Sequence, residues 1–231
     1  LKAAFPLDIQ ARQSSAEVQF GYVRRPTDDN TSWQAAQFEV CAQRWLHLGE
    51  PGFGAAVLNQ GGYGFDISRA RTGDQRGAGP TTVRYSLLRA PQYPDPAADL
   101  GAQHIEYSLL VGDVADAVRE GTAKALPERT VRGATGRAPL VSVDDPGVVI
   151  SAVKLADDRS GDLIVRCYEA LGRRAHPTLT LGMPVTRVQA VNLLERPDPD
   201  VAALTTLDVQ GSRVGMSLTA FQIVTLRVTR A

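Results

Sequence analysis

The acidic side chains are the first candidates for chemistry in this chain, because two converging carboxylates can cleave a glycosidic bond, one as acid/base and one as nucleophile. Asp144 and Asp145 precede a proline and are typical of a turn, whereas Glu169 and Glu195 end predicted strands, where a carboxylate often accepts hydrogen bonds from a turn. The acids therefore allow either a glycoside-related site or a purely structural role. The candidates are Asp66, Asp95, Asp99, Asp144, Asp145, Glu169 and Glu195.

A polar loop at residues 59–66 (NQGGYGFD) is a second candidate. It follows an apolar stretch and combines the amide of Asn59, the phenol of Tyr63 and the carboxylate of Asp66 with glycines that let a ligand approach the backbone. Sugars require such a mixture of polar groups for their hydroxyls and an aromatic face for the ring. A plain tight loop between two strands has the same composition, so both interpretations stay open. Trp33, in a polar stretch, is either an exposed platform or an ordinary surface residue.

Metal, serine-hydrolase and phosphate-loop chemistry are not indicated. The three histidines, His47, His104 and His176, lie far apart and form no paired metal-ligand motif. No G-x-S-x-G elbow occurs, and Gly61-Gly62 is not followed by the Lys-Ser or Lys-Thr of a phosphate loop. We expect no metal site in this chain.

The elements that would position these residues are mostly strands, because the apolar residues recur with a period of two. Gly-bearing loops predict hairpins between 148–155 and 162–169 and between 204–209 and 214–219. Further strands are predicted at 17–23, 37–45, 103–111 and 222–229, with Ile105, Tyr107, Leu109 and Val111 on one face of the third. We expect irregular loops at 68–80 and at 89–100, where three prolines interrupt the chain.

Only one segment is predicted to be helical. Asp113 could cap a helix that continues through Ala125 and that Pro127 stops. One short helix cannot supply the crossovers of a parallel sheet. The predicted fold is therefore all-β, a large antiparallel β-sandwich over residues 1–231 that divides into two sub-sheets near 127–139.

The overall composition limits the possible partners and compartments. The 231 residues are 43% hydrophobic, and 25 Lys and Arg balance 25 Asp and Glu. A net charge of zero argues against a nucleic-acid partner, whose phosphates favour a basic face. No apolar run approaches the ~20 residues of a membrane helix. Two cysteines without C-x-x-C spacing, and no signal-peptide pattern, predict a cytoplasmic location.

Several stretches, in order along nearly the whole chain, resemble a known family. The chain is similar to the C-terminal β-domain of the family 38 α-mannosidases, in their bacterial and fungal cytosolic branch. Where that family often has a histidine-bearing stretch, this sequence has Leu110-Val111-Gly112-Asp113, so a sugar contact there would be lost or replaced. The matching stretches include Arg25-Pro26-Thr27, Asn30-Thr31-Ser32-Trp33, Leu58-Asn59, Tyr63-Gly64, Leu87-Leu88-Arg89, Tyr93-Pro94-Asp95-Pro96 and Leu194-Glu195.

The resemblance implies a fold, an activity and a role for this region. Members of the family are zinc-dependent retaining hydrolases of terminal α-mannosides, with the zinc and the nucleophile in an N-terminal catalytic domain that these residues do not include. Their C-terminal part is a large sandwich related to galactose mutarotase that packs on the catalytic domain and lends loops to the substrate site. The resemblance implies substrate contacts for Asn59, Tyr63, Asp66, Arg25, Asn30, Trp33 and Arg89.

Three functions follow as hypotheses. The first is the C-terminal domain of an α-mannosidase, inactive alone, with its catalytic domain and mannose-containing oligosaccharides as partners. The alternative is a freestanding carbohydrate-binding module without catalysis. A mutarotase-like epimerase is disfavoured, because it needs a histidine acid facing a carboxylate base and the histidines are scattered. An isolated domain can also expose the apolar patch that meets its partner, so self-association to a homo-oligomer is expected.

Overall fold

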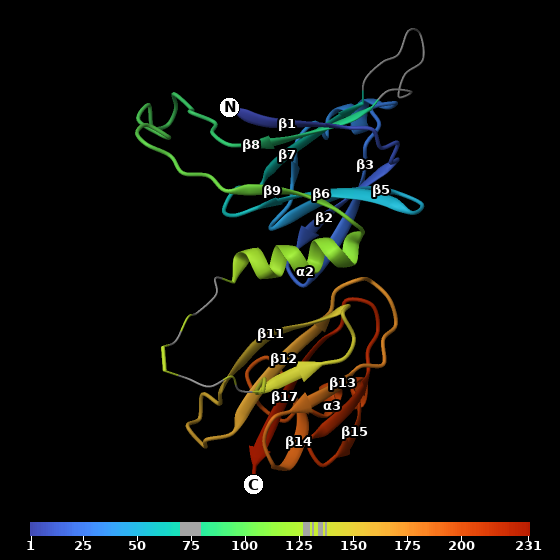
Figure 1. The fold of residues 1–231 in the computed structure, drawn as a ribbon, viewed down its shortest axis with the longest axis vertical. Helices are drawn as coiled ribbons and strands as arrows, with labels where there is room; N and C mark the ends of the chain where they lie inside the picture. Colours follow the sequence, from blue (N-terminus) through green and yellow to red (C-terminus); the bar gives the residue numbers. More distant parts are fainter. Residues whose placement is uncertain (70–79, 127–129, 131, 134–135, 137) are drawn as a thin grey trace. The chain divides into compact units, whose positions relative to one another are not determined.

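The computed structural model describes residues 1–69, 80–126, 130, 132–133, 136 and 138–231. The chain divides into two compact units, Leu1–Glu128 and Arg129–Ala231, which are described separately below (Figure 1). None of the described helices is long and apolar enough to cross a membrane. Within the described residues every strand pairing is antiparallel, which confirms the predicted all-β antiparallel fold.

The first unit contains two sheets, with strand orders β1-β8-β7-β4 and β3-β2-β5-β6-β9. Inward-facing residues of the two sheets share one core, in which the stacked rings of Phe65 and Tyr85 lie 5.0 Å apart. The strands are β1 (Lys2–Leu7), β2 (Gln13–Val18), β3 (Gly21–Pro26), β4 (Val40–Cys41), β5 (Trp45–Glu50), β6 (Phe53–Asn59), β7 (Gly64–Arg69), β8 (Thr81–Ser86) and β9 (Tyr107–Val111).

Helix α2 (Val114–Ala125) covers part of the outer face of the five-stranded sheet. Its predicted start is confirmed: the Asp113 side chain accepts the amide of Asp116, whose own side chain accepts the amide of Asp113. The helix packs closely against the fully buried Trp45, and this close packing is possible because Gly121 has no side chain at the contact. A Cβ at Gly121 would lie 2.7 Å from Cδ1 of that indole.

The second unit is also built from two sheets around one core, with strand orders β10-β13-β16-β15 and β11-β12-β17-β14. The two predicted hairpins are confirmed as β11–β12 and β15–β16. Val224, Leu226 and Val228 face the core as predicted. The elements are β10 (Val141–Val143), β11 (Val148–Leu155), β12 (Leu163–Glu169), β13 (Thr178–Leu181), β14 (Val185–Val191), α3 (Pro199–Leu204), β15 (Thr206–Gln210), β16 (Arg213–Ser217) and β17 (Ile223–Arg230).

The prediction of a single helix was wrong, because two further short helices form, each beginning at a capping residue. Helix α1 (Ser32–Ala35) begins at a capping box between Thr31 and Gln34. Helix α3 begins at Asp198, whose side chain accepts two backbone amides, and has a proline in its first turn. The Asn-Thr-Ser-Trp stretch is thus the start of a helical turn.

Three strand predictions were also wrong in extent. Residues 17–23 contain a turn between β2 and β3, where Phe20 takes a positive φ of 59°. Within 37–45 only Val40 and Cys41 pair with a neighbouring strand before β5, and Phe38 is 76% exposed. Alternation alone could not show these breaks, because pairing depends on partners distant in the sequence.

The strand predicted at 103–111 begins only at Tyr107, and its apolar face is not covered along its length. Tyr107 reaches the rings of Phe5 and Tyr85, but Leu109 and Val111 are 52% and 67% exposed. The physical reason is position, since β9 is the edge strand of its sheet. The predicted loop at 89–100 is irregular as expected, whereas most of 68–80, and part of 127–139, lie outside the described residues.

Candidate functional site

The seven predicted substrate contacts all belong to the first unit, but the structure brings only two of them to one groove. This groove, which we call the β7 groove, has a volume of about 730 Å³. Residues of β7 and β8 line it together with residues between 26 and 40 and with Gln10 and Arg12. Asn30 and Asp66 both line it, together with Asp28, Gln34, Phe38, Arg69 and Arg84.

Asp66 is the most constrained of the predicted residues. Its side chain is buried, and each of its two oxygens is already paired: Oδ1 with Arg84 Nε at 2.5 Å and Oδ2 with Lys2 Nζ at 2.5 Å. Lys2 also contacts Glu39 at 3.1 Å. The hydrogen bond to Asp66 raises the pKa of Lys2, and the hydrogen bond from Lys2 lowers the pKa of Glu39. This carboxylate therefore anchors a charged network at the end of the groove.

Sequence reasoning missed the two cations of this network. Arg84 lies directly opposite Asp66 in the β7–β8 register, and Lys2 comes from β1 at the edge of the same sheet. No strand was predicted around Arg84, so its place opposite Asp66 became visible only with the β7–β8 pairing. Lys2 carried no such signal, because 64 residues separate it from Asp66.

The loop at 59–66 is held mainly by contacts within the unit. Asn59 is buried, and its side-chain amide donates to the carbonyl of Gly62. Position 62 has room only for glycine, since a Cβ there would lie 2.1 Å from the hydroxyl oxygen of Tyr85. Tyr63 is 56% exposed. The glycine at 62 thus has an internal packing reason, while the exposed phenol stays available to a ligand.

The other predicted contacts are dispersed. Trp33 lies in α1 and is 68% exposed, as an aromatic platform would be. Arg25 is in β3, and its Nη1 is buried without a hydrogen-bond partner among the described residues. Arg89 is exposed at the start of the long loop between β8 and β9, whose base is closed where Asp99 accepts the amides of Arg89 and Ala90. Whether these residues meet a sugar stays a prediction.

The two strand-end glutamates of the second unit have structural roles, as their positions suggested. Glu169 is fully buried and accepts four backbone amides. Oε1 accepts from Leu171 at 2.8 Å, and Oε2 accepts from Gly172 at 2.8 Å and from Arg173 and Phe221, both at 3.1 Å. The carboxylate thus fastens the turn after β12 to the turn before β17.

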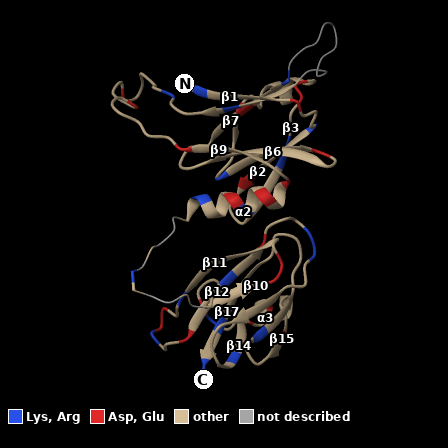
Figure 2. Ribbon diagram, viewed as in Figure 1, with Lys and Arg blue, Asp and Glu red and all other residues tan. Residues whose placement is uncertain are grey.

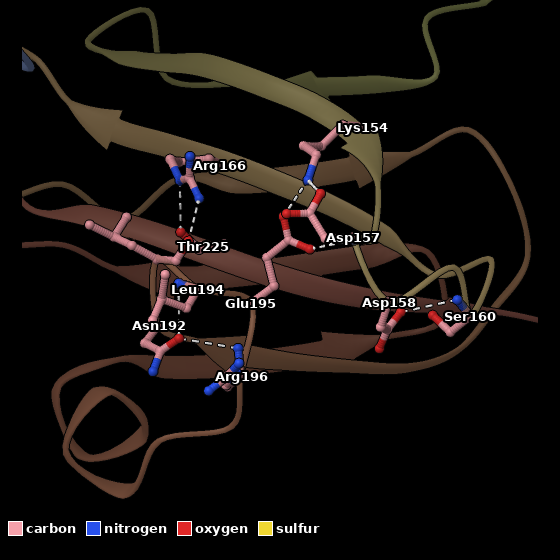
Figure 3. Close-up of polar contacts among 11 residues, drawn as sticks. Lys154, Asp157, Asp158, Ser160, Arg166, Asn192, Leu194, Glu195, Arg196 and Thr225 are labelled. Carbon is pink, nitrogen blue, oxygen red and sulfur yellow. Dashed lines mark hydrogen bonds and ion pairs between the residues drawn. The ribbon is translucent and has the colours of Figure 1, made fainter.

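Glu195 joins two loops in a similar way (Figure 3). Its carboxylate accepts from the Lys154 ammonium and, at 2.8 Å, from the amide of Asp157. Asn192 shapes the same loop, since its side-chain oxygen accepts the amides of Leu194 and Arg196. Both glutamates are occupied by the protein's own donors, which leaves them without a catalytic arrangement.

The charges and possible metal ligands of the described residues bear on the zinc that the resemblance implies. Figure 2 shows acidic and basic residues distributed over both units. Among the described residues, no group of three or more His, Cys, Asp or Glu is placed to hold a metal ion. The zinc implied by the resemblance therefore has no fitting ligand set in the described part of this chain.

Comparison with known proteins agrees with this architecture. Residues 1–97 match the model "Glycosyl hydrolases family 38 C-terminal domain", and residues 147–226 match "Glycosyl hydrolases family 38 C-terminal beta sandwich domain". Human alpha-mannosidase 2C1 is 38% identical over 237 residues, which cover 98% of this chain and 21% of that protein. The alpha-mannosidase of Saccharomyces cerevisiae is 29% identical over 215 residues, covering 84% of this chain and 19% of that protein.

A solved structure shares the fold. The crystal structure of an alpha-mannosidase from Enterococcus faecalis V583 superposes with a TM-score of 0.69 at 17% identity, covering 98% of this chain and 25% of that one. The fold and the matched models define an all-β C-terminal region of a glycoside hydrolase. The chain belongs to the C-terminal domains of glycosyl hydrolase family 38. It spans about a fifth of the length of the relatives it matches.

Proposed function

We propose that this chain is the C-terminal part of a cytoplasmic α-mannosidase that hydrolyses terminal α-linked mannose. The observation that carries the proposal is the match over 98% of the chain to human alpha-mannosidase 2C1, at 38% identity. The match covers 21% of that relative, so the remaining length would hold the catalytic groups. Retention of configuration, and zinc bound outside this chain, are part of the proposal.

This region would support the reaction by binding and positioning. The β7 groove offers the amide of Asn30 and the guanidinium groups of Arg69 and Arg84 as hydrogen-bond donors, and the carboxylate of Asp28 as an acceptor. Asp66 would hold the Arg84 side chain in place through their ion pair. Such groups can orient a sugar and exclude water from it, but the described residues place no acid/base pair there.

The test compares this chain with the longer protein encoded by its gene. We expect the longer protein to hydrolyse an aryl α-mannoside and to lose that activity on removal of its metal. The present chain should show no hydrolysis at the same concentration. Hydrolysis by the present chain alone would contradict the proposal. An inactive longer protein whose C-terminal region still bound mannosides in calorimetry would favour a carbohydrate-binding module instead.

A further inference from the structure

A second and larger groove lies on the outer face of the five-stranded sheet of the first unit, beside the start of α2. Its volume is about 1110 Å³, and we call it the His47 groove. Ligand pockets generally range over about 300–1,000 Å³, so the space suits more than one sugar ring. None of the seven predicted substrate contacts lines it.

His47 lines this groove and is held in a fixed position by its neighbours. The residue is 6% exposed, and Nε2 lies 3.0 Å from the carbonyl oxygen of Gly112. Two glycines, which pair with each other across β5 and β6, leave room for the ring to pack against the sheet. A Cβ at Gly49 would lie 2.6 Å from Cε1 of the ring, and a Cβ at Gly54 would lie 2.6 Å from Nε2.

This contact determines which ring nitrogen can receive a ligand. A carbonyl can only accept, so the proton of the neutral imidazole belongs on Nε2, and Nδ1 carries a lone pair. Burial lowers the pKa of His47, which favours this neutral form at neutral pH. Nδ1 has no hydrogen-bond partner among the described residues. It is therefore available as an acceptor for a hydroxyl group.

The walls offer both donors and acceptors that the fold does not use. The guanidinium groups of Arg12 and Arg24 line the groove and form no ion pair with a described residue. Asp28 also lines it, and its Oδ1 is shielded from solvent without accepting a hydrogen bond in the described part of the chain. Phe53 is 50% exposed and adds an apolar ring to the same lining.

The charges argue against an anionic ligand. Four carboxylates, those of Asp28, Glu50, Asp113 and Asp116, line the groove against two guanidinium groups. The amides at the start of α2 are also engaged, since the side chains of Asp113 and Asp116 cap them. A hydroxyl group both donates and accepts, so a neutral polyhydroxylated ligand matches this lining best.

We propose that the His47 groove binds a neutral oligosaccharide, with one hydroxyl donating to His47 Nδ1 and others bridging Arg24 and Asp28. The class of ligand, a neutral polyol, follows from the residues that line the groove. The choice of a mannose disaccharide as probe rests on the proposed function. A glucose disaccharide is therefore included, so that binding of the ligand class can be tested independently of mannose.

The test is a titration of the 15N-labelled chain with α-linked mannobiose, with cellobiose as a second neutral sugar and mannose 6-phosphate as an anionic one. We expect saturable shifts of the His47 Nδ1 resonance and of the amides of Gly49, Gly54 and Gly112. Arg24→Gln and Asp28→Asn should each weaken binding at least tenfold, because each removes a charged hydrogen-bonding group. The matched control Arg174→Gln, at an exposed site of the second unit, should bind within twofold of the parent chain.

Each other outcome has a defined meaning. Absence of saturable shifts with both disaccharides, or shifts confined to residues that line only the β7 groove, such as Asn30 and Phe38, would overturn the proposal. Tighter binding of mannose 6-phosphate than of either neutral sugar would overturn the ligand class. Amide spectra that are unchanged away from the groove show that the variants fold. Failure of the mannosidase proposal would appear separately, as absence of hydrolysis by the longer protein.

Discussion

Replacing Glu169 by glutamine should cost the second unit a large part of its stability, although the two side chains have nearly the same shape. The carboxylate is fully buried and accepts four backbone amides, three at Oε2 and one at Oε1. A glutamine at this position can place its single side-chain oxygen where Oε2 accepts three amides. Its NH₂ group then takes the place of Oε1 and faces the amide of Leu171, so two hydrogen-bond donors oppose each other.

The magnitude follows from this one mismatch and from the lost charge. A buried group that loses its hydrogen-bond partner costs about 1–3 kcal/mol, and a bond to a charged group contributes about 1.5–3 kcal/mol. We therefore expect the free energy of unfolding to fall by about 3 kcal/mol. With a urea m-value of about 2 kcal/mol/M, the midpoint should fall by about 1.5 M. Glu169→Ala removes the acceptor of all four amides and should cost more.

Hydrogen exchange measured by mass spectrometry at increasing urea concentrations can follow this unit separately. Peptides that cover 163–175 and 216–224 should lose protection earlier in Glu169→Gln than in the parent chain. The matched control is Glu120→Gln on α2, because within the described residues Glu120 is paired only with its exposed neighbour Arg119 and should change stability by less than about 1 kcal/mol. Equal stability of both variants would refute the assigned role of the carboxylate.

The remaining predictions concern a thiol, an imidazole and an ion pair. Burial raises the pKa of Cys167 to about 12, so in the native chain a thiol reagent at pH 8 should modify exposed Cys41 and reach Cys167 only after denaturation. Burial also lowers the pKa of His47 below its ordinary value of about 6.5, so just below that value the unfolded chain binds more protons than the folded chain. The free energy of unfolding, measured by chemical denaturation at each pH, should therefore fall on acidification from pH 7 to 5. It should fall less in His47→Gln. Asp66→Ala leaves two partly exposed cations that water can solvate, so thermal unfolding should show a loss of only about 1–2 kcal/mol, and a loss above 4 kcal/mol would contradict this account.

The elements that the sequence predicted well are those with local signals. The hairpin β11–β12 follows from two alternating runs around a glycine-bearing loop, and α2 follows from the capping residue Asp113 and the helical spacing after it. The elements that it predicted poorly depend on neighbours. Phe38 alternates like a strand residue and yet is 76% exposed, since among the described residues strand pairing in this segment begins only at Val40.

The sequence by itself determined the antiparallel all-β class, the capped helix and the resemblance to family 38, because these depend on residue types at short, fixed spacing. Only the tertiary structure decided that Asp66 is paired with Lys2 and Arg84, and that His47 packs against two glycines in the lining of a groove. The contact from Lys2 to Asp66 spans 64 residues, and that from His47 to Gly112 spans 65. Contacts of such length arise from sheet register and packing, which no local pattern encodes.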